Sequence, residues 1–354
     1  MAIIDTFLRK EVEKIHTPSV AYIHFNKDNI IHQFKSGMAD IKNRIKVDDK
    51  TTYHAFSVTK TFTALAILQL AEQHKIAIDH PVIQYLPDFP YAPGITIRQL
   101  LTHSAGIPNP IPLNWIHLTS EHSLFDRNAF FNEVMRKHNK IKSKPDERYA
   151  YSNLGYILLG QLIEKVSGAT YEQYISTNII KKLGIGSNEL GFVIDDYRKH
   201  AVGYHKRWSL SNIVLGFFID KREYMGKSVG KWKPFKNFYV NGTSYGGLIG
   251  TPRAFMKYIQ ALLQQDSNLL AAEYKQLLFT ENFLQSHKGT GMCLSWFTGQ
   301  LNGQTYFTHA GGGGGYYCEI RIYPEAGLGS VIMFNRTGMR DERYLDKVDR
   351  YVIK

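Results

Sequence analysis

The two ends of the chain carry matching patterns, and this feature constrains the fold more than any other. Near the N-terminus, apolar residues recur at helical spacing: Ile4, Phe7, Leu8, Val12 and Ile15. Two β-rich runs follow at residues 20–25 and 30–34, separated by the turn-forming residues 26–29. The N-terminal end therefore predicts a helix followed by a β-hairpin.

The C-terminal end predicts the same parts in the opposite order. Residues 316–323 and 328–334 are strand-like, residues 324–327 supply a turn, and residues 341–353 are polar and compatible with a helix. The middle, from about 60 to 185, indicates helices and loops. We therefore expect an α/β plus all-α fold, in which one antiparallel β-sheet is flanked by N- and C-terminal helices and a helical lobe is inserted.

The chain has 354 residues, of which 44% are hydrophobic and 21% charged, which is ordinary for a globular protein. We expect one unit over residues 1–354. Its α/β lobe would comprise about 1–60 and 240–354, and its helical lobe about 61–239. Apart from the glycine run at 311–315, the sequence shows no repeats or low-complexity segments.

The net charge of +12 attracts anions to the surface. The sequence lacks zinc-finger spacing and an RNP-like aromatic box, so we expect no nucleic-acid partner. Positive charge is concentrated in a basic insertion at 206–237, which has eight Lys or Arg against Asp220 and Glu223 and an apolar stretch at 213–219. Two interpretations stay open: weak membrane-surface contact or substrate gating, and a surface lobe with its own small core.

The N-terminus lacks the basic and apolar regions of a secretory signal, and no run of about 18 apolar residues exists. We therefore expect a cytoplasmic protein as the sequence stands, or a periplasmic or secreted one if a leader has been removed. Cys293 and Cys318 are expected to be free thiols, although adjacent strands would let them pair. Without His-Glu-x-x-His, paired cysteines or a phosphate-binding loop, no metal and no cofactor is expected.

Ser57-Val58-Thr59-Lys60 is the first segment that indicates catalysis. A Ser-x-x-Lys pattern is weak alone, since the chain repeats it at Ser228 and Lys231. The first copy leads into residues that are apolar nearly all round, which indicates a buried helix. Lys60 then lies one turn beyond Ser57 on the same face, and burial lowers the pKa of a lysine amine toward that of a useful base.

Two further segments carry polar groups suited to acyl transfer. Tyr151-Ser152-Asn153 opens a predicted helix that ends before Gly168, so its phenol could relay a proton and its amide could bind a substrate amide. A second Tyr-x-Asn pattern at 239–241 lacks such a helix. His309-Ala310-Gly311, followed by Gly312, places a hydrogen-bonding residue before a backbone that a ligand can approach closely.

In this order and at these separations, the three segments resemble the serine β-lactamase and penicillin-binding-protein superfamily, and its class C branch most of all. That branch also holds D,D-peptidases, D-aminopeptidases and esterases, and its motifs are Ser-x-x-Lys, Tyr-x-Asn and Lys-Thr-Gly or His-x-Gly. Residues 100–107, 246–252 and 291–296 are similar to other signatures of the family. The resemblance covers roughly residues 1–340.

The resemblance implies a role for each motif residue. Ser57 would be the acylated nucleophile, Lys60 its activating neighbour and Tyr151 the proton shuttle, while Asn153 would bind the substrate amide. The backbone N–H groups of Ser57 and Gly312 would form the oxyanion hole. His309, with Gly311 beside it, replaces the lysine of true class C β-lactamases with a group that titrates near neutrality, which argues against efficient β-lactam hydrolysis. A near match to the lysine motif at 288–291 is misplaced, because it precedes the Trp296 strand.

We therefore expect a serine hydrolase that acts through an acyl-enzyme on an amide, ester or lactam carbonyl of a small molecule, peptide or ester. The alternative from a different class is a non-catalytic or weakly catalytic sensor or scaffold protein resembling a penicillin-binding protein. The sequence leaves the natural substrate and the oligomeric state open.

Overall fold

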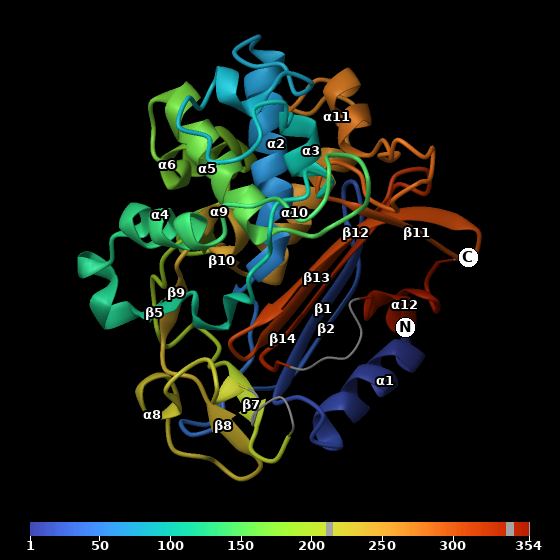
Figure 1. Cartoon of the computed structure of the whole chain (residues 1–354). Coiled ribbons are helices and arrows are strands. Elements are labelled where there is room, and N and C mark those ends of the chain that lie inside the picture. The colour runs from blue at the N-terminus through green and yellow to red at the C-terminus, as the bar shows by residue number, and fades with distance from the viewer. Residues whose placement is uncertain (210–214, 338–342, 354) are drawn as a thin grey trace.

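A seven-stranded antiparallel sheet forms the centre of the computed structural model, which describes residues 1–209, 215–337 and 343–353 (Figure 1). The strand order is β11-β12-β13-β14-β1-β2-β3. The strands are β1 (Ser19–Asn26), β2 (Ile30–Asp40), β3 (Ile45–Lys46), β11 (Phe297–Leu301), β12 (Gln304–Gly313), β13 (Tyr316–Tyr323) and β14 (Leu328–Phe334). Both ends of the chain thus supply one sheet, which confirms the predicted fold class.

Strand β1 pairs with β14 on one side and with β2 on the other, so the N- and C-terminal hairpins are joined at the middle of the sheet. The N-terminal hairpin turn is closed by the Asn26 side chain, whose Oδ1 accepts hydrogen bonds from the backbone N–H groups of Asp28 and Asn29. In the C-terminal hairpin, Gly327 adopts a φ of +64°, which favours glycine. Strands β1, β13 and β14 are buried nearly throughout, because helices cover both faces of the sheet.

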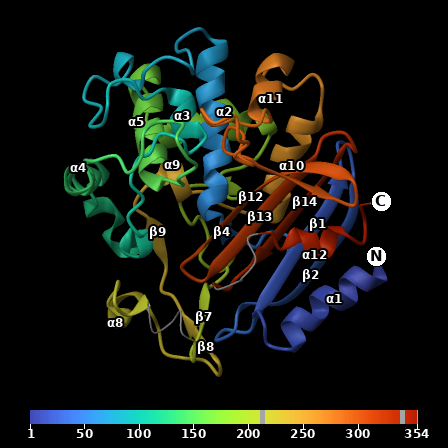
Figure 2. The same ribbon diagram turned by 45° about the vertical axis from the view of Figure 1, so that its right-hand side comes forward.

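Helices α1 (Ala2–Glu13) and α12 (Leu345–Asp349) lie on one face of the sheet (Figure 2). The predicted N-terminal helix is confirmed, but it ends at Glu13, before the last residue of its apolar pattern. Ile15 lies beyond α1 with a φ of +55°, where the chain turns toward β1. The predicted C-terminal helix is also shorter than expected, and residues 341 and 342 of that prediction lie outside the described residues.

A buried ion-pair network attaches α12 to the sheet. Arg321 of β13 has no exposed side-chain surface and bonds Glu319 at 2.8 Å and Asp346 at 2.6 Å. The backbone N–H of Leu345 donates to Glu319 Oε2 at 2.9 Å. Because an unpaired buried charge would be costly, these bonds favour one position of α12 on the sheet.

Helix α10 (Pro252–Leu263) packs on the opposite face, and the other helices extend beyond it (Figures 1 and 2). At their centre is α2 (Thr59–Glu72), buried from Thr59 to Ala71 as its all-round apolar sequence predicts. Around it lie α3 (Ile97–Leu101), α4 (Arg127–Lys137), α5 (Asn153–Ser167), α6 (Tyr171–Ile175), α9 (Thr243–Gly246) and α11 (Ala272–Leu278). Helix α5 ends at Gly168 with a φ of +72°, which confirms the predicted stop. The lobe boundaries proposed from the sequence stay a prediction.

Short strands and single helical turns connect these layers. The strands are β4 (Tyr53–His54), β5 (Ile116–Leu118), β6 (Leu190–Gly191), β9 (Phe238–Val240) and β10 (Ile249–Gly250). The single turns are η1 (Phe56–Val58), η2 (Val82–Gln84), η3 (Pro112–Asn114), η4 (Thr119–Leu124), η5 (Ser176–Ile180) and η6 (Lys181–Leu183). Strand β4 pairs with β10 and leads directly to η1, which carries Ser57.

The basic insertion forms strand β7 (Tyr204–Lys206), helix α8 (Lys221–Tyr224) and strand β8 (Trp232–Pro234), with β7 paired to β8. Its buried side chains Leu215, Ile219, Met225 and Phe235 join the main hydrophobic core. The expectation of a separate small core is therefore wrong, because these side chains pack inward on the body of the protein. Residues 213 and 214 of the predicted apolar stretch lie outside the described residues.

Both cysteines are buried free thiols, in agreement with the preferred expectation for Cys293 and Cys318. Burial raises the pKa of each thiol, so both are poor nucleophiles at neutral pH. Within the described residues, no helix has the length and apolar character needed to cross a membrane.

Candidate active site

Ser57 lies in η1, the single turn that precedes α2. The residue before it, Phe56, has a φ of +46°, a left-handed conformation that costs a non-glycine residue about 1–3 kcal/mol. Packing on both sides keeps the chain in this conformation, and the backbone N–H of Ala55 donates to the carbonyl of Leu248 at 2.9 Å. Ser57 itself is half-buried and lines a cavity.

Lys60 is fully buried in the first turn of α2. Its Nζ lies 3.1 Å from Ser57 Oγ and 2.9 Å from the carbonyl oxygen of Tyr245. The rings of Tyr151, Tyr156 and Tyr245 surround the amine at 5.0–5.4 Å. Burial holds the pKa of Lys60 well below its ordinary value. A neutral amine beside a serine hydroxyl can accept the proton of that hydroxyl.

Tyr151 approaches Ser57 from the helical side, and its hydroxyl lies 3.0 Å from Ser57 Oγ. The segment 100–107 holds it there. The ring of His103 packs 4.2 Å from the ring of Tyr151. The backbone N–H of Ser152 donates to His103 Nδ1 at 3.1 Å, and that of Ala150 donates to the His103 carbonyl at 2.7 Å.

His103 is therefore a positioning residue, which the sequence revealed only through the resemblance of its segment to a family signature. Because Nδ1 accepts a hydrogen bond, the neutral ring carries its proton on Nε2. Burial, followed by repulsion from the positive charges that Lys60 and His309 carry when protonated, lowers the pKa of His103 well below its ordinary value. A neutral ring in this position keeps the Tyr151 side chain directed at Ser57 without adding charge.

Asn153 is the first residue of α5, with Ser152 as the N-cap. Its side chain is nearly buried, and its Oδ1 has no hydrogen-bond partner in the described part of the chain. Asn153 is not among the residues that line the cavity at Ser57. Its role as a ligand of the substrate amide stays a prediction.

Strand β12 forms the opposite wall and comes unusually close to Ser57. A Cβ atom on Gly311 would lie 2.1 Å from the carbonyl oxygen of Ala55 and 2.6 Å from the Ser57 nitrogen. A Cβ on Gly312 would make only ordinary contacts, the nearest at 3.5 Å. Glycine is thus sterically required at 311, because any other residue would push β12 away from Ser57.

His309 lies on β12 beside this contact but is buried. Its Nδ1 lies 2.5 Å from the Ser295 carbonyl oxygen, to which it donates a hydrogen bond. Burial and the nearby Lys60 lower the pKa of His309 to about 3. The expectation that this group titrates near neutrality is therefore wrong, because its ring has been removed from water, and His309 is neutral at physiological pH.

The cavity in front of Ser57 has a volume of about 700 Å³. Aromatic side chains supply much of its wall, and Arg343 is the only cationic group among its described lining residues. The Arg343 guanidinium donates to the Tyr306 hydroxyl at 3.1 Å. The lining residues are Ser57, Tyr149, Tyr151, Phe297, Thr308, His309, Ala310, Gly311, Gly312, Tyr316, Tyr317, Thr337 and Arg343. Sequence reasoning missed seven of these lining residues, since no motif contains them: Tyr149, Phe297, Thr308, Tyr316, Tyr317, Thr337 and Arg343.

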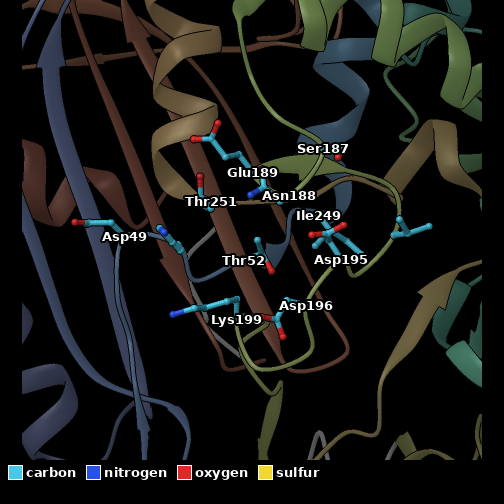
Figure 3. Close-up of a pocket in the computed structure, with 12 residues that line it drawn as sticks. Asp49, Thr52, Ser187, Asn188, Glu189, Asp195, Asp196, Lys199, Ile249 and Thr251 are labelled. Atoms are coloured by element: carbon cyan, nitrogen blue, oxygen red, sulfur yellow. The ribbon is translucent and has the colours of Figure 1, made fainter.

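A second cavity, of about 380 Å³, has a different character (Figure 3). Its wall carries four carboxylates, from Asp49, Glu189, Asp195 and Asp196. The hydroxyl of Ser187 also lines it, but within the described residues no lysine amine or tyrosine hydroxyl is hydrogen-bonded to that serine. The arrangement needed for serine nucleophile chemistry is therefore found at Ser57 and not at Ser187.

Comparisons with known proteins identify the family and the fold of the chain. The family model for beta-lactamase matches residues 4–353. Protein flp of Staphylococcus aureus (strain COL) is 26% identical over 344 residues, which cover 94% of this chain and 62% of flp. The chain thus spans less than two thirds of that relative.

Among solved structures, the octameric penicillin-binding protein homologue from Pyrococcus abyssi has a TM-score of 0.78 at 24% identity. The match covers 99% of this chain and 76% of the homologue's chain. The D-amino acid amidase from Ochrobactrum anthropi SV3, complexed with D-phenylalanine, has a TM-score of 0.77 at 18% identity, covering 99% and 96%. These likenesses show a shared fold. The family match over nearly the whole chain shows that the chain belongs to the beta-lactamase family, within the superfamily of serine β-lactamases and penicillin-binding proteins.

Proposed function

We propose that the chain is a serine hydrolase that forms an acyl-enzyme at Ser57. One observation carries the proposal: Ser57 Oγ lies within hydrogen-bond distance of both the buried Lys60 amine and the Tyr151 hydroxyl, at the wall of a large cavity. A serine hydroxyl needs a nearby base to become a nucleophile, and the lowered pKa of Lys60 makes its amine such a base.

The proposed reaction follows from these contacts. Ser57 Oγ forms a bond to the substrate carbonyl carbon as its proton passes to Lys60 Nζ. Tyr151 then donates its hydroxyl proton to the leaving nitrogen or oxygen as the bond to the carbonyl carbon breaks, and Lys60 returns a proton to Tyr151. Water then bonds to the acyl carbon as its proton passes to the same pair, and that proton returns to Ser57 Oγ as the bond between Ser57 and the acyl carbon breaks.

The negative charge that develops on the carbonyl oxygen needs donors that are already in position. The backbone N–H groups of Ser57 and Gly312 are our candidates, since both residues line the cavity. Gly311 also lets the backbone of β12 lie close to the backbone of η1. Such preorganised donors are commonly worth about 3–4 kcal/mol of transition-state stabilisation each.

The wall of the cavity favours particular acyl donors. Tyr149, Phe297 and Tyr317 offer aromatic surface, and Arg343 offers a positive charge, while no carboxylate lines the described part of the wall. An ammonium group on the substrate would find no anionic partner there. We therefore infer that, among substrates with the same kind of reactive carbonyl, the site prefers those with an apolar acyl group and an anionic group, such as the carboxylate of a peptide, over free amines.

Efficient β-lactam hydrolysis fits this site less well. A neutral His309 stands where true class C β-lactamases carry a lysine. We expect p-nitrophenyl esters and D-amino acid peptides to be hydrolysed faster than nitrocefin. A nitrocefin rate typical of a resistance enzyme would contradict this ranking.

The test is an intact-mass screen with fluorophosphonate, fluorescent penicillin and a panel of acyl donors. We expect one adduct per chain, absent from Ser57→Ala and present in Ser228→Ala, which removes the serine of the second Ser-x-x-Lys pattern. If the native protein gains no Ser57-dependent adduct from any donor, the chain is better described as a non-catalytic binding protein that keeps the fold.

The inferred substrate preference has its own test. Arg343→Ala should raise KM about tenfold for an anionic substrate, in keeping with the loss of one charge-assisted hydrogen bond. It should leave KM nearly unchanged for the methyl ester or amide of the same substrate. Equal effects on both substrates would mean that Arg343 acts only through its structural bonds to β11 and β12.

A further inference from the structure

The basic insertion protrudes from the body of the protein. Strands β7 and β8 and helix α8 lie at one end of the molecule, away from the helical layer that contains α2 (Figures 1 and 2). Residues 206–237 include six lysines and two arginines but only two acidic residues. The cations are Lys206, Arg207, Lys221, Arg222, Lys227, Lys231, Lys233 and Lys236. Lys227, Lys231 and Lys236 are exposed.

The same end carries exposed aromatic side chains. Trp208 and Phe217 are each 83% exposed, and among large hydrophobic side chains of the described residues only Leu124 is more exposed. The guanidinium of Arg207 lies 5.1 Å from the centre of the Trp208 ring. Their neighbours Leu215 and Ile219 pack into the core. Trp208 and Phe217 thus expose large apolar surfaces to water, although neighbouring side chains fix this segment to the core.

Positive charges crowd one another on this surface. Burial, and then the charges of Arg336 and Lys231, lower the pKa of Lys206, while the negative charge of Glu11 opposes this effect. Burial and then Lys233 lower the pKa of Lys221. The local acid Asp220 already bonds Arg222 at 3.4 Å. An external anion would relieve this repulsion, so the surface is suited to a negatively charged partner.

We propose that residues 204–209 and 215–237 form a docking surface for an anionic lipid bilayer. The cations would lie against the phosphate headgroups, each adding to the attraction, and Trp208 and Phe217 would enter the boundary between headgroups and acyl chains. The exposed aromatic rings favour a bilayer over a soluble polyanion, because a polyanion offers no apolar phase to receive them. The contact is peripheral and independent of the chemistry at Ser57.

The chain contains a built-in reporter for this proposal. Of its four tryptophans, Trp115, Trp232 and Trp296 are buried and only Trp208 is exposed. Vesicles of phosphatidylglycerol and phosphatidylcholine should shift the tryptophan emission of the native protein to shorter wavelength, whereas pure phosphatidylcholine vesicles should not. Trp208→Ala should remove the shift. Raising NaCl from 50 to 500 mM should release the protein, because salt screens the attraction.

A matched pair of charge variants tests the cations. Lys227→Glu/Lys231→Glu/Lys236→Glu should reduce sedimentation with the anionic vesicles at least tenfold. Lys75→Glu/Lys140→Glu/Lys165→Glu makes the same change in net charge on exposed lysines of the helical layer and should sediment like the native protein. Thermal melting and acylation at Ser57 check that both variants are folded.

Three results would overturn the proposal. The first is a lack of sedimentation of the native protein with anionic vesicles. The second is an equal loss of sedimentation in both charge variants, which would indicate a net-charge effect without a defined surface. The third is a pair of observations: soluble polyphosphate prevents vesicle binding, and the Trp208 emission does not shift when vesicles are added. Together they would indicate an anionic polymer as the partner.

Discussion

The chain contains the Ser-x-x-Lys pattern twice, and the two copies differ in the burial and contacts of their serine and lysine side chains. In the first, Lys60 is fully buried on α2, among three tyrosine rings, and its amine lies 3.1 Å from Ser57. In the second, Ser228 and Lys231 are both exposed, in the turn that precedes β8. The four-residue spacing is shared, so the difference between the copies comes from what packs around them.

The Tyr-x-Asn pattern, also present twice, teaches the same lesson. The Tyr151 hydroxyl points at Ser57, at 3.0 Å. The Tyr239 hydroxyl instead accepts a hydrogen bond from the backbone N–H of Ile194, and Asn241 Oδ1 lies 2.9 Å from His117 Nδ1. In the second copy the polar groups hold neighbouring segments together. A motif becomes chemically active only where burial and partners leave its groups directed at one another.

The largest difference between the copies should follow from removing each lysine amine. Lys60→Met should lower kcat/KM about 10³- to 10⁴-fold, because the hydroxyl of Ser57 loses its base. Lys231→Met should change kcat/KM by no more than about twofold, as for an ordinary surface substitution. Steady-state kinetics with a p-nitrophenyl ester measures both. A comparable loss in the two variants would show that the packing of Lys60 is not what distinguishes the copies.

The two tyrosines should differ next. Tyr151→Phe should lower kcat about 10²- to 10³-fold while the fold is kept, since only the proton relay is removed. Tyr239→Phe should leave kcat unchanged but destabilise the protein by about 1 kcal/mol through its lost hydrogen bond. Kinetics and urea unfolding of both variants provide the measurement. A large loss of activity in Tyr239→Phe would contradict the comparison.

The approach of β12 to Ser57 can be tested with adjacent glycines. Gly311→Ala should lower kcat about 10²-fold or more, because its Cβ would meet the Ala55 carbonyl and the Ser57 nitrogen. Gly312→Ala keeps its backbone N–H and meets no close atom, so a change of less than about tenfold is expected. Rates of acylation by fluorophosphonate compare the two variants. Equal tolerance at both positions would mean that β12 can move away without cost to the site.

The smallest effect is a pH dependence of stability. Burial lowers the pKa of Lys60, so the folded protein binds fewer protons there than the unfolded chain between that lowered pKa and the ordinary lysine value of about 10.4. Stability from this site therefore increases as pH rises. The free energy of unfolding of Lys60→Met minus that of the native protein should be largest at low pH, where the native protein is destabilised by the buried amine. This difference should decrease toward pH 10.

The neutral state of His309 gives a separate prediction. His309 is neutral above pH 4, and His309→Gln should leave the acidic limb of the kcat/KM profile in place. A limb near pH 6.5 that disappears in His309→Gln would contradict the buried, neutral state of that ring.

Local patterns in the sequence were sufficient for much of the fold and for the choice of three candidate catalytic segments. Alternating and helical periodicities report which faces are buried, so the terminal hairpins, the buried α2 and the stop at Gly168 could be predicted. The apolar residues after Lys60 distinguished the first Ser-x-x-Lys copy from the second for the same reason. Element ends were less accurate, as Ile15 shows, because the chain leaves a helix where tertiary contacts require it.

Only the tertiary structure decided the charge state of His309 and the composition of the cavity wall. Both depend on residues far apart in the chain: the Ser295 carbonyl and Lys60 set the environment of His309, and the connecting segments bring Tyr149, Phe297 and Arg343 to Ser57. A pKa is determined by loss of water and by nearby charges, which no short motif encodes. The sequence by itself determined which groups the chain can use, and packing determined which of them meet and in what ionisation state.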